Sequence, residues 1–176
     1  LKDLIGDNCI LTDVGSVKTS IHEEVAAFGL EECFIGGHPM AGSEKSGFAN
    51  SKAHLIENSY YILTPSAKVS GEKIAAYRDF VSSLKAIPII LDYKEHDHIT
   101  GTISHLPHII ASSLVNFVRV TDTKDELMKA LAAGGFKDIT RIASSSPVMW
   151  QQICLKNSRN ISHILGEYIE TLERAK

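Results

Sequence analysis

The spacing of the apolar residues changes near Asp92, and this change limits the folds open to the chain. Before Asp92, short β-rich runs alternate with stretches in which apolar residues recur about every three or four positions, and Ser70 is a candidate N-cap for one such helix. This alternation favours βαβ units and a parallel sheet, with ligands at the carboxyl ends of the strands. From about Tyr93 only the helical spacing remains, so we predict an α/β unit over residues 1–92 and an all-α unit over residues 93–176. The β-rich runs are 9–14, 33–37, 60–64 and 87–91.

The helical half contains several capping and breaking signals. A long amphipathic helix over residues 99–117 is expected to kink at Pro107, which lacks a backbone donor. A capping box at 123–126 is expected to open a short helix that ends at the glycine pair 134–135. The pair 146–147, Ser-Pro, places an N-cap and a first-turn proline ahead of a further helix.

The composition of the 176 residues, 44% hydrophobic and 22% charged, is that of a soluble globular protein. The net charge of -3 and the lack of a long basic cluster argue against a nucleic-acid groove. Cys9, Cys33 and Cys154 lie far apart, which favours unpaired thiols in a reducing, cytoplasmic setting. There is no run of about 18 apolar residues and no charged-then-apolar leader, so we expect no membrane span or signal peptide. Residues 1–6 read as the tail of a helix, with no initiator Met, and we expect the chain to be a fragment.

The run Asp13-Val-Gly-Ser-Val-Lys18 is expected at a turn from a strand into a helix. Gly15 would let the backbone approach a ligand, and the helix N-terminus would offer free N–H groups to an anion or to the edge of a cofactor. The alternative is an ordinary βα turn in which Ser16 caps the helix. The run is not a phosphate-binding Walker A loop, because Val17 stands where that loop has a glycine.

The glycine-rich segment 36–47 follows a β-rich run and contains His38. Histidine is the side chain that most readily accepts a proton near neutral pH, and glycines around it would expose it to a substrate. Ser43, Glu44 and Lys45 lie in the same short loop. A single surface histidine is usually inert, but the polar residues gathered in one loop favour a functional role for His38.

Five residues at helical spacing share one face of the long helix, and we expect them to form the wall of a polar pocket. Imidazoles one turn apart can share a zinc ion, but no carboxylate or cysteine completes a ligand set. The remaining alternative is a solvated helix face. The five residues are His98, Gly101, His105, His108 and Ser112.

Lys137 and Arg141 lie one helical turn apart after the glycine pair 134–135. A guanidinium held on a helix suits the bidentate capture of a carboxylate. The alternative is that Arg141 pairs with Asp138 on a solvated helix.

Together and in this order, these segments resemble the prephenate dehydrogenase family, which includes arogenate and cyclohexadienyl dehydrogenases. The resemblance implies that residues 1–92 are the carboxyl-terminal half of a Rossmann-like nucleotide-binding domain with a partial parallel sheet. Residues 93–176 would be an all-helical substrate-binding and dimerisation domain, with a homodimer as the assembly. The matching runs are D-V-G-S-V-K at 13–18, G-G-H-P-M-A-G-S-E-K-S-G at 36–47, S-H-L-P-H at 104–108 and G-G-F-K-D-I-T-R-I-A-S-S-S-P-V-M-W at 134–150.

The resemblance implies oxidative decarboxylation of prephenate to 4-hydroxyphenylpyruvate in tyrosine biosynthesis, with hydride passing to NAD or NADP. His38 would accept the proton of the ring hydroxyl, and Ser16 would touch that hydroxyl and the nicotinamide. Arg141 would bind a substrate carboxylate. Asp13, Gly15 and Ser16 would border the cofactor, Ser104, His105 and His108 would line the substrate pocket, and Glu44 and Lys45 would support its mouth.

The sequence departs from the family in one large respect. The G-x-G-x-x-G turn that holds the pyrophosphate, and the acidic residue that follows it, have no match here. We therefore expect the chain to be a folded dimer that does not turn over by itself. The alternatives are an arogenate dehydrogenase, a non-catalytic chain that dimerises or binds a carboxylate, and a histidine-rich metal hydrolase.

Overall fold

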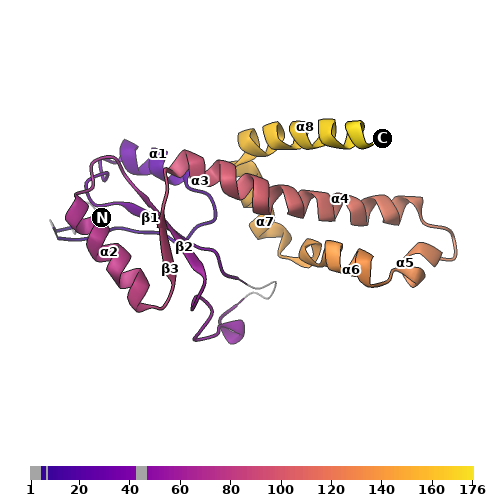
Figure 1. Cartoon of the computed structure of the whole chain (residues 1–176), viewed down its shortest axis with the longest axis horizontal. Coiled ribbons are helices and arrows are strands. Elements are labelled where there is room, and N and C mark those ends of the chain that lie inside the picture. The colour runs from indigo at the N-terminus through magenta and orange to yellow at the C-terminus, as the bar shows by residue number, and fades with distance from the viewer. Residues whose placement is uncertain (1–4, 7, 43–46) are drawn as a thin grey trace. The chain divides into compact units, whose positions relative to one another are not determined.

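The computed structural model describes residues 5–6, 8–42 and 47–176, which form two compact units (Figure 1). The first unit ends at Ile99 and the second begins at Thr100. This boundary lies after the change in sequence pattern near Asp92. The reason is that two side chains of the helix that follows Asp92 are hydrogen-bonded to the first unit, as described below. The helix predicted for residues 1–6 falls largely outside the described residues.

The first unit contains a mixed sheet of β1 (Ile35–Pro39), β2 (Tyr60–Pro65) and β3 (Ile87–Ile90), in the order β1-β2-β3. The β2–β3 pair is parallel, but the β1–β2 pair is antiparallel, so the expected parallel arrangement covers only part of the sheet. The predicted strand at 9–14 forms a single parallel bridge, Leu11 to Phe34, rather than a regular strand. The α/β class predicted for this half is confirmed.

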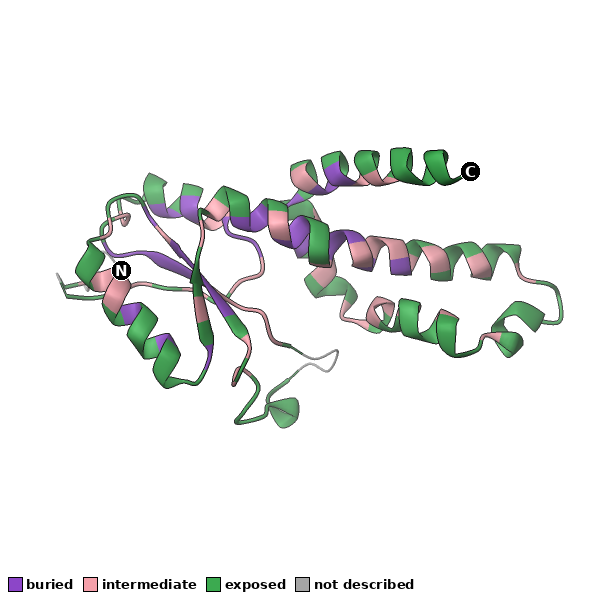
Figure 2. Cartoon of the chain, in the orientation of Figure 1, coloured by how far each residue is buried: buried purple, intermediate pink, exposed green. Residues whose placement is uncertain are grey.

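Helices and a small apolar core complete the first unit. The helices are α1 (Thr19–Ala27), α2 (Gly71–Ser83) and α3 (Tyr93–Thr100), with a short 3₁₀ turn, η2, at Phe48–Asn50. Ser70 caps α2 as predicted, because its hydroxyl accepts a hydrogen bond from the backbone N–H of Lys73. Figure 2 shows that the buried residues run along β1 and β2. The core consists of Ile35, Tyr61, Leu63, Tyr77, Val81 and Ala86.

The described part of the second unit is entirely helical, as predicted, and its first element, η3, follows α3 directly along the chain. The N–H of Leu106 donates to the carbonyl of Gly101, five residues earlier, so η3 is a π-helical turn. Pro107 then lies in the first turn of α4, where its missing donor costs nothing, and the irregularity expected at Pro107 lies in the turn before it. No helix among the described residues is long and apolar enough to cross a membrane. The elements are η3 (Gly101–His105), α4 (Leu106–Thr121), α5 (Leu127–Leu131), α6 (Gly134–Thr140), η4 (Arg141–Ser144), α7 (Pro147–Lys156) and α8 (Ser158–Ala175).

Two predicted helix boundaries in the second unit are wrong. The capping box does not form, because Glu126 adopts a left-handed backbone (φ 52°) and precedes α5 instead of lying in its first turn. Instead of the capping box, the carboxylate of Asp122 accepts hydrogen bonds from the backbone N–H groups of Met128 and Lys129. The glycine pair 134–135 begins α6 rather than ending the helix before it.

Replacing Gly37 by alanine is expected to destabilise the first unit by about 1–3 kcal/mol, the usual cost of overpacking. A Cβ atom at Gly37 would lie 2.6 Å from the backbone carbonyl oxygen of Asp13 and 2.9 Å from the hydroxyl of Tyr61. Gly71→Ala is the matched control, because a Cβ atom at the start of α2 meets nothing within 4 Å. Urea denaturation of the two variants measures the difference, and equal stability would show that β1 is not held close to residue 13.

Candidate active site

The turn before α1 is held together by the carboxylate of Asp13. One oxygen accepts the N–H of Gly15 at 2.8 Å and forms an ion pair with Lys18, and the other accepts the N–H of Gly37 at 3.2 Å. Lys18 is fully buried, and burial lowers the pKa of its ammonium group against the opposing effect of Asp13. Asp13 was predicted to border a cofactor. In the structure its carboxylate forms hydrogen bonds and an ion pair that hold the turn in shape. In the same turn, Val14 is exposed and Ser16 is half-buried.

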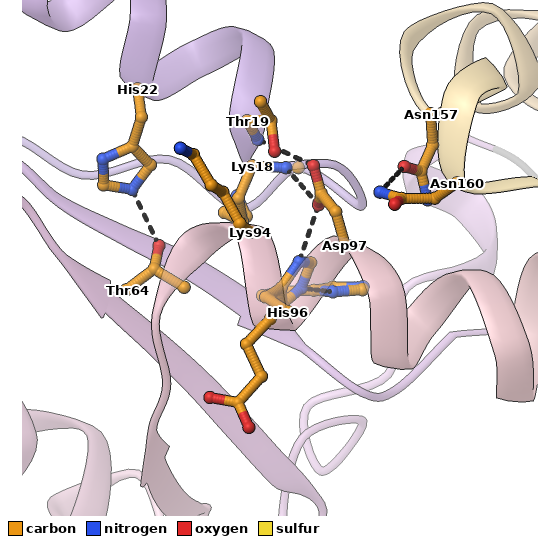
Figure 3. Close-up of polar contacts among 12 residues, drawn as sticks. Lys18, Thr19, His22, Thr64, Lys94, His96, Asp97, Asn157 and Asn160 are labelled. Atoms are coloured by element: carbon orange, nitrogen blue, oxygen red, sulfur yellow. Dashed lines mark hydrogen bonds and ion pairs between the residues drawn. The ribbon is translucent and has the colours of Figure 1, made fainter.

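The N-terminus of α1 is occupied by a side chain from α3. The N–H of Lys18 donates to one carboxylate oxygen of Asp97 and the N–H of Thr19 to the other, each at 2.8 Å (Figure 3). Two of the N–H groups that this helix terminus was expected to offer to a ligand, those of Lys18 and Thr19, are therefore already bonded to a carboxylate of the chain itself. Ser16 does not cap the helix either, because the N-cap position is Lys18.

A chain of hydrogen bonds runs from Asp97 to His38. Nδ1 of His96 lies 2.8 Å from a carboxylate oxygen of Asp97, and Nε2 of His96 lies 2.8 Å from Nδ1 of His38. His96 and Asp97 are fully buried, whereas His38, on β1, is half-buried. Burial by itself would raise the pKa of Asp97, but hydrogen bonds from His96, Thr19 and Lys18 lower it on balance. This chain of three side chains holds one ring nitrogen of His38 and gives the histidine a fixed orientation.

Sequence reasoning found His38 but missed His96 and Asp97. The run Glu95-His-Asp-His98 is visible in the sequence, yet adjacent residues on a helix do not face each other, so their spacing gives no sign of a pair. His96 finds its partner on β1, 58 residues earlier in the chain. The polar run at the start of a predicted helix was the only signal that could have drawn attention to these two residues.

The histidines predicted to line a pocket are held by contacts within the second unit. Nδ1 of His105 lies 3.0 Å from the amide nitrogen of Asn157, and the ring of His108 stacks on that of Trp150 with centroids 3.6 Å apart. Burial lowers the pKa of His108. Nε2 of His108 lies 3.4 Å from the hydroxyl of Ser112. The ring of Trp150, on α7, also meets that of His105 edge-on with centroids 6.0 Å apart, so α7 and the residue that ends it fix both histidines.

The other residues predicted to line the pocket differ from one another in burial. Gly101 is buried against α8, Ser104 is half-buried, and His98 is exposed. The π-helical turn at 101–105 changes the phase of the helix, which separates His98 from the later positions. Among the residues that the structure describes, no group of three or more histidines, cysteines and carboxylates is placed to hold a metal ion.

Arg141, predicted to capture a carboxylate, is exposed and begins η4, which packs against α4. Lys137 is in the last turn of α6, so the two basic residues lie on either side of a helix junction. Glu44 and Lys45, together with Ser43, lie outside the described residues.

A further buried histidine, His22, lies in α1 and contacts Thr64 of β2. Its Nε2 is 3.0 Å from the hydroxyl of Thr64 (Figure 3). Its Nδ1 is 3.3 Å from the hydroxyl of Ser66. The ring stacks on Tyr93 with centroids 4.4 Å apart. Burial, and next the charge of Lys18, lower the pKa of His22 below its ordinary value of 6.5.

Comparison with known proteins gives matches along nearly the whole chain. The family model described as "Prephenate dehydrogenase, nucleotide-binding domain" matches residues 1–90, and the one described as "Prephenate dehydrogenase, dimerization domain" matches residues 92–176. The prephenate dehydrogenase of Bacillus subtilis (strain 168) is 41% identical over 168 residues, which cover 95% of this chain and 45% of that protein. That of Lactococcus lactis subsp. cremoris (strain MG1363) is 45% identical over 153 residues, covering 86% of this chain and 41% of that protein. The chain therefore spans less than half the length of these two relatives.

Solved structures give the same result. The prephenate dehydrogenase from A. aeolicus in complex with hydroxyphenyl propionate and NAD+ matches with a TM-score of 0.89 and 32% identity, over 98% of this chain and 60% of that one. The arogenate dehydrogenase from Synechocystis matches with a TM-score of 0.81 and 32% identity, over 94% of this chain and 59% of that one.

The stability of the first unit is expected to fall as the pH is lowered below about 6.5, because the unfolded chain then binds a proton that buried His22 does not accept. A depressed histidine pKa contributes stability above the unfolded pKa and loses it below, at up to about 1.4 kcal/mol per pH unit for one proton. Urea denaturation between pH 7 and pH 5 measures this slope, and His22→Gln should flatten it. His163→Gln, on the exposed side of α8, controls for the substitution. An unchanged slope in His22→Gln would mean that His22 is protonated within the fold.

Proposed function

The chain belongs to the prephenate dehydrogenase family, and from this we propose that the protein converts prephenate to 4-hydroxyphenylpyruvate by oxidative decarboxylation, a step of tyrosine biosynthesis. The observation that carries the proposal is the position of His38 on β1, where His96 holds one ring nitrogen at 2.8 Å. A half-buried histidine with one nitrogen fixed in this way suits a general base.

The reaction requires one proton acceptor. Hydride leaves the ring carbon that bears the hydroxyl group, and the hydroxyl proton passes to Nε2 of His38, the ring nitrogen that His96 does not hold. The bond from the ring to its carboxylate then breaks, its electron pair completes the aromatic ring, and carbon dioxide leaves. The ring oxygen takes the proton back from His38, which gives the hydroxyl group of 4-hydroxyphenylpyruvate and restores the neutral histidine. When bound, the nicotinamide supplies the hydride acceptor. Ser16, half-buried in the turn before α1, is assigned a hydrogen bond to the same hydroxyl group.

The described residues fit the nicotinamide end of a dinucleotide better than its phosphates. The turn at Gly15 is tight, because a Cβ atom there would lie 2.8 Å from the carboxylate of Asp13. Asp97 already accepts the first N–H groups of α1, so that helix terminus does not suit a pyrophosphate. We therefore assign Gly15 and Ser16 to the nicotinamide edge, with Asp13 shaping the turn, and either NAD or NADP as the cofactor.

Residues of the second unit are assigned to the substrate. Arg141 is exposed and has the planar, bidentate donor group that a carboxylate of prephenate would require. His105 and His108 are fixed by Asn157 and Trp150, which suits residues that line a pocket. Ser104 is assigned to the same wall, and Glu44 and Lys45 to its mouth.

A homodimer is the proposed assembly. An open apolar groove lies between α4 and α8, and it would bring large apolar side chains into water in a single copy. A second copy is the proposed occupant, because the family model that covers this unit describes a dimerization domain. The groove is lined by Ile109, Ile110, Ser113, Leu114, Phe117, Leu165, Tyr168, Ile169 and Leu172.

In the full-length protein, His38→Asn is expected to lower kcat for prephenate by roughly 10²–10⁴-fold, because asparagine keeps a polar side chain but cannot take up a proton. Formation of reduced nicotinamide, measured with prephenate and with arogenate, gives the rate and the substrate. His54→Asn is the matched control, because His54 is an exposed histidine of the same unit. A kcat that survives His38→Asn would remove His38 from the mechanism.

The chain is expected to sediment as a dimer, and Phe117→Asp to shift it toward the monomer by placing a charge in the α4–α8 groove. Phe117 is 63% exposed, and Phe80, on α2 of the first unit, is 55% exposed. Phe80→Asp therefore makes the same change at a similarly exposed phenylalanine outside the groove, and it should leave the dimer intact. Sedimentation velocity distinguishes the species. A monomeric parent chain, or a dimer that persists in Phe117→Asp, would contradict the assignment.

A further inference from the structure

We propose that His96 and Asp97 are positioning residues that fix the tautomer of His38, so that its Nδ1 carries the proton and its Nε2 the lone pair. The inference deepens the proposed function and rests on it, because the tautomer matters to catalysis only if His38 is the base. It assigns the reactive atom of His38 and two residues that do not touch the substrate.

The direction of each hydrogen bond follows from Asp97. An ionised carboxylate can only accept, so Nδ1 of His96, 2.8 Å from the Asp97 oxygen, must be the donor. When His96 carries a single ring proton, its Nε2 then holds a lone pair and accepts. Nδ1 of His38, 2.8 Å away, must therefore donate, which leaves the lone pair of His38 on Nε2.

The fold keeps Asp97 ionised and prevents it from turning. Its two oxygens accept the backbone N–H groups of Lys18 and Thr19, each at 2.8 Å, and these donors cannot move without disrupting the start of α1. The charge of Lys18 acts on Asp97, and Lys18 is itself ion-paired with Asp13. The ammonium group of Lys18 favours a negative charge on Asp97, and Lys18 is itself buried and held.

The consequence for catalysis is that the imidazole of His38 already has its lone pair on Nε2, the nitrogen that is to accept the proton. Nε2 of His38 can accept the hydroxyl proton with no exchange of protons between its two nitrogens beforehand. As His38 becomes positively charged, it keeps its Nδ1–H bond to His96, and the negative charge of Asp97 lies one imidazole further on. Losing this support should lower kcat more than it changes KM, because it acts on the proton transfer and not on substrate binding.

Two substitutions at His96 distinguish the hydrogen bond that it accepts from His38 from the one that it donates to Asp97. The side-chain amide of glutamine extends about as far as Nε2 of histidine, so His96→Gln can still offer an oxygen to Nδ1–H of His38. The shorter asparagine reaches only the position of Nδ1, so His96→Asn can still donate to Asp97 but loses the bond to His38. Asp97→Asn is less informative, because its amide N–H₂ would face a backbone N–H donor at the start of α1.

The tautomer is read directly by nitrogen-15 NMR of histidine-labelled chain at pH 8, above the ordinary histidine pKa of about 6.5. We expect His38 to carry its proton on Nδ1 in the parent chain and in His96→Gln, and to shift toward the Nε2–H form in His96→Asn. In the full-length protein, kcat should fall roughly 10–100-fold in His96→Asn, with a smaller change in KM and substantial recovery in His96→Gln. His22→Gln, at a buried histidine outside this hydrogen-bond chain, should change neither the tautomer nor kcat.

The outcomes separate the inference from the proposed function. A parent chain with the His38 proton on Nε2, or a tautomer that His96→Asn does not change, would overturn the inference whatever the activity. A tautomer that shifts in His96→Asn while kcat stays constant would retain the tautomer assignment and overturn the role of His38 as base. Circular dichroism establishes that each variant is folded, and if His96→Asn fails to fold, the tautomer of the parent chain and the recovery in His96→Gln still decide.

Discussion

The buried carboxylate of Asp97 is the interaction on which the first unit depends. It accepts the N–H groups that open α1 and the ring nitrogen of His96, and through His96 it reaches His38 on β1. A buried charge is tolerated only where its hydrogen bonds replace those it made to water, so these groups have little freedom to move. One side chain thereby sets the start of a helix, the position of α3 within its unit and the orientation of a histidine.

A second carboxylate, that of Asp13, fixes the same region from the other side. It binds the turn that leads into α1 and the N–H of Gly37, next to His38 in the chain. Gly37 makes this close approach possible, because a Cβ atom there would lie 2.6 Å from the backbone oxygen of Asp13. A Cβ atom at Gly36 would instead collide with the hydroxyl of Thr64. The glycines of this segment therefore serve packing as well as access, whereas the sequence pattern suggested access alone.

Local signals in the sequence were sufficient for much of the fold. The helix that Ser70 caps and the one that follows the Ser146-Pro147 pair begin where predicted, because a cap acts within one turn. The box at 123–126 failed because Asp122, just outside it, offers a better-placed carboxylate. His38 could be selected from its surroundings in the sequence, but His96 and Asp97 could not, because their partners come from distant parts of the chain. The strand at 9–14 was overestimated, because a β-rich composition does not determine how many residues pair.

Carbon-13 NMR of the Asp97 carboxyl carbon, followed in the folded chain as the pH is lowered, tests most directly whether an ionised carboxylate organises the site. Asp97→Ala, compared at neutral pH, assigns the resonance. The hydrogen bonds around Asp97 predict that it stays ionised at and below its ordinary pKa of 3.8 for as long as the chain remains folded. A carboxyl group that takes up its proton at or above that value in the folded chain would contradict this, because a protonated Asp97 no longer dictates the direction of the hydrogen bonds to His96 and His38.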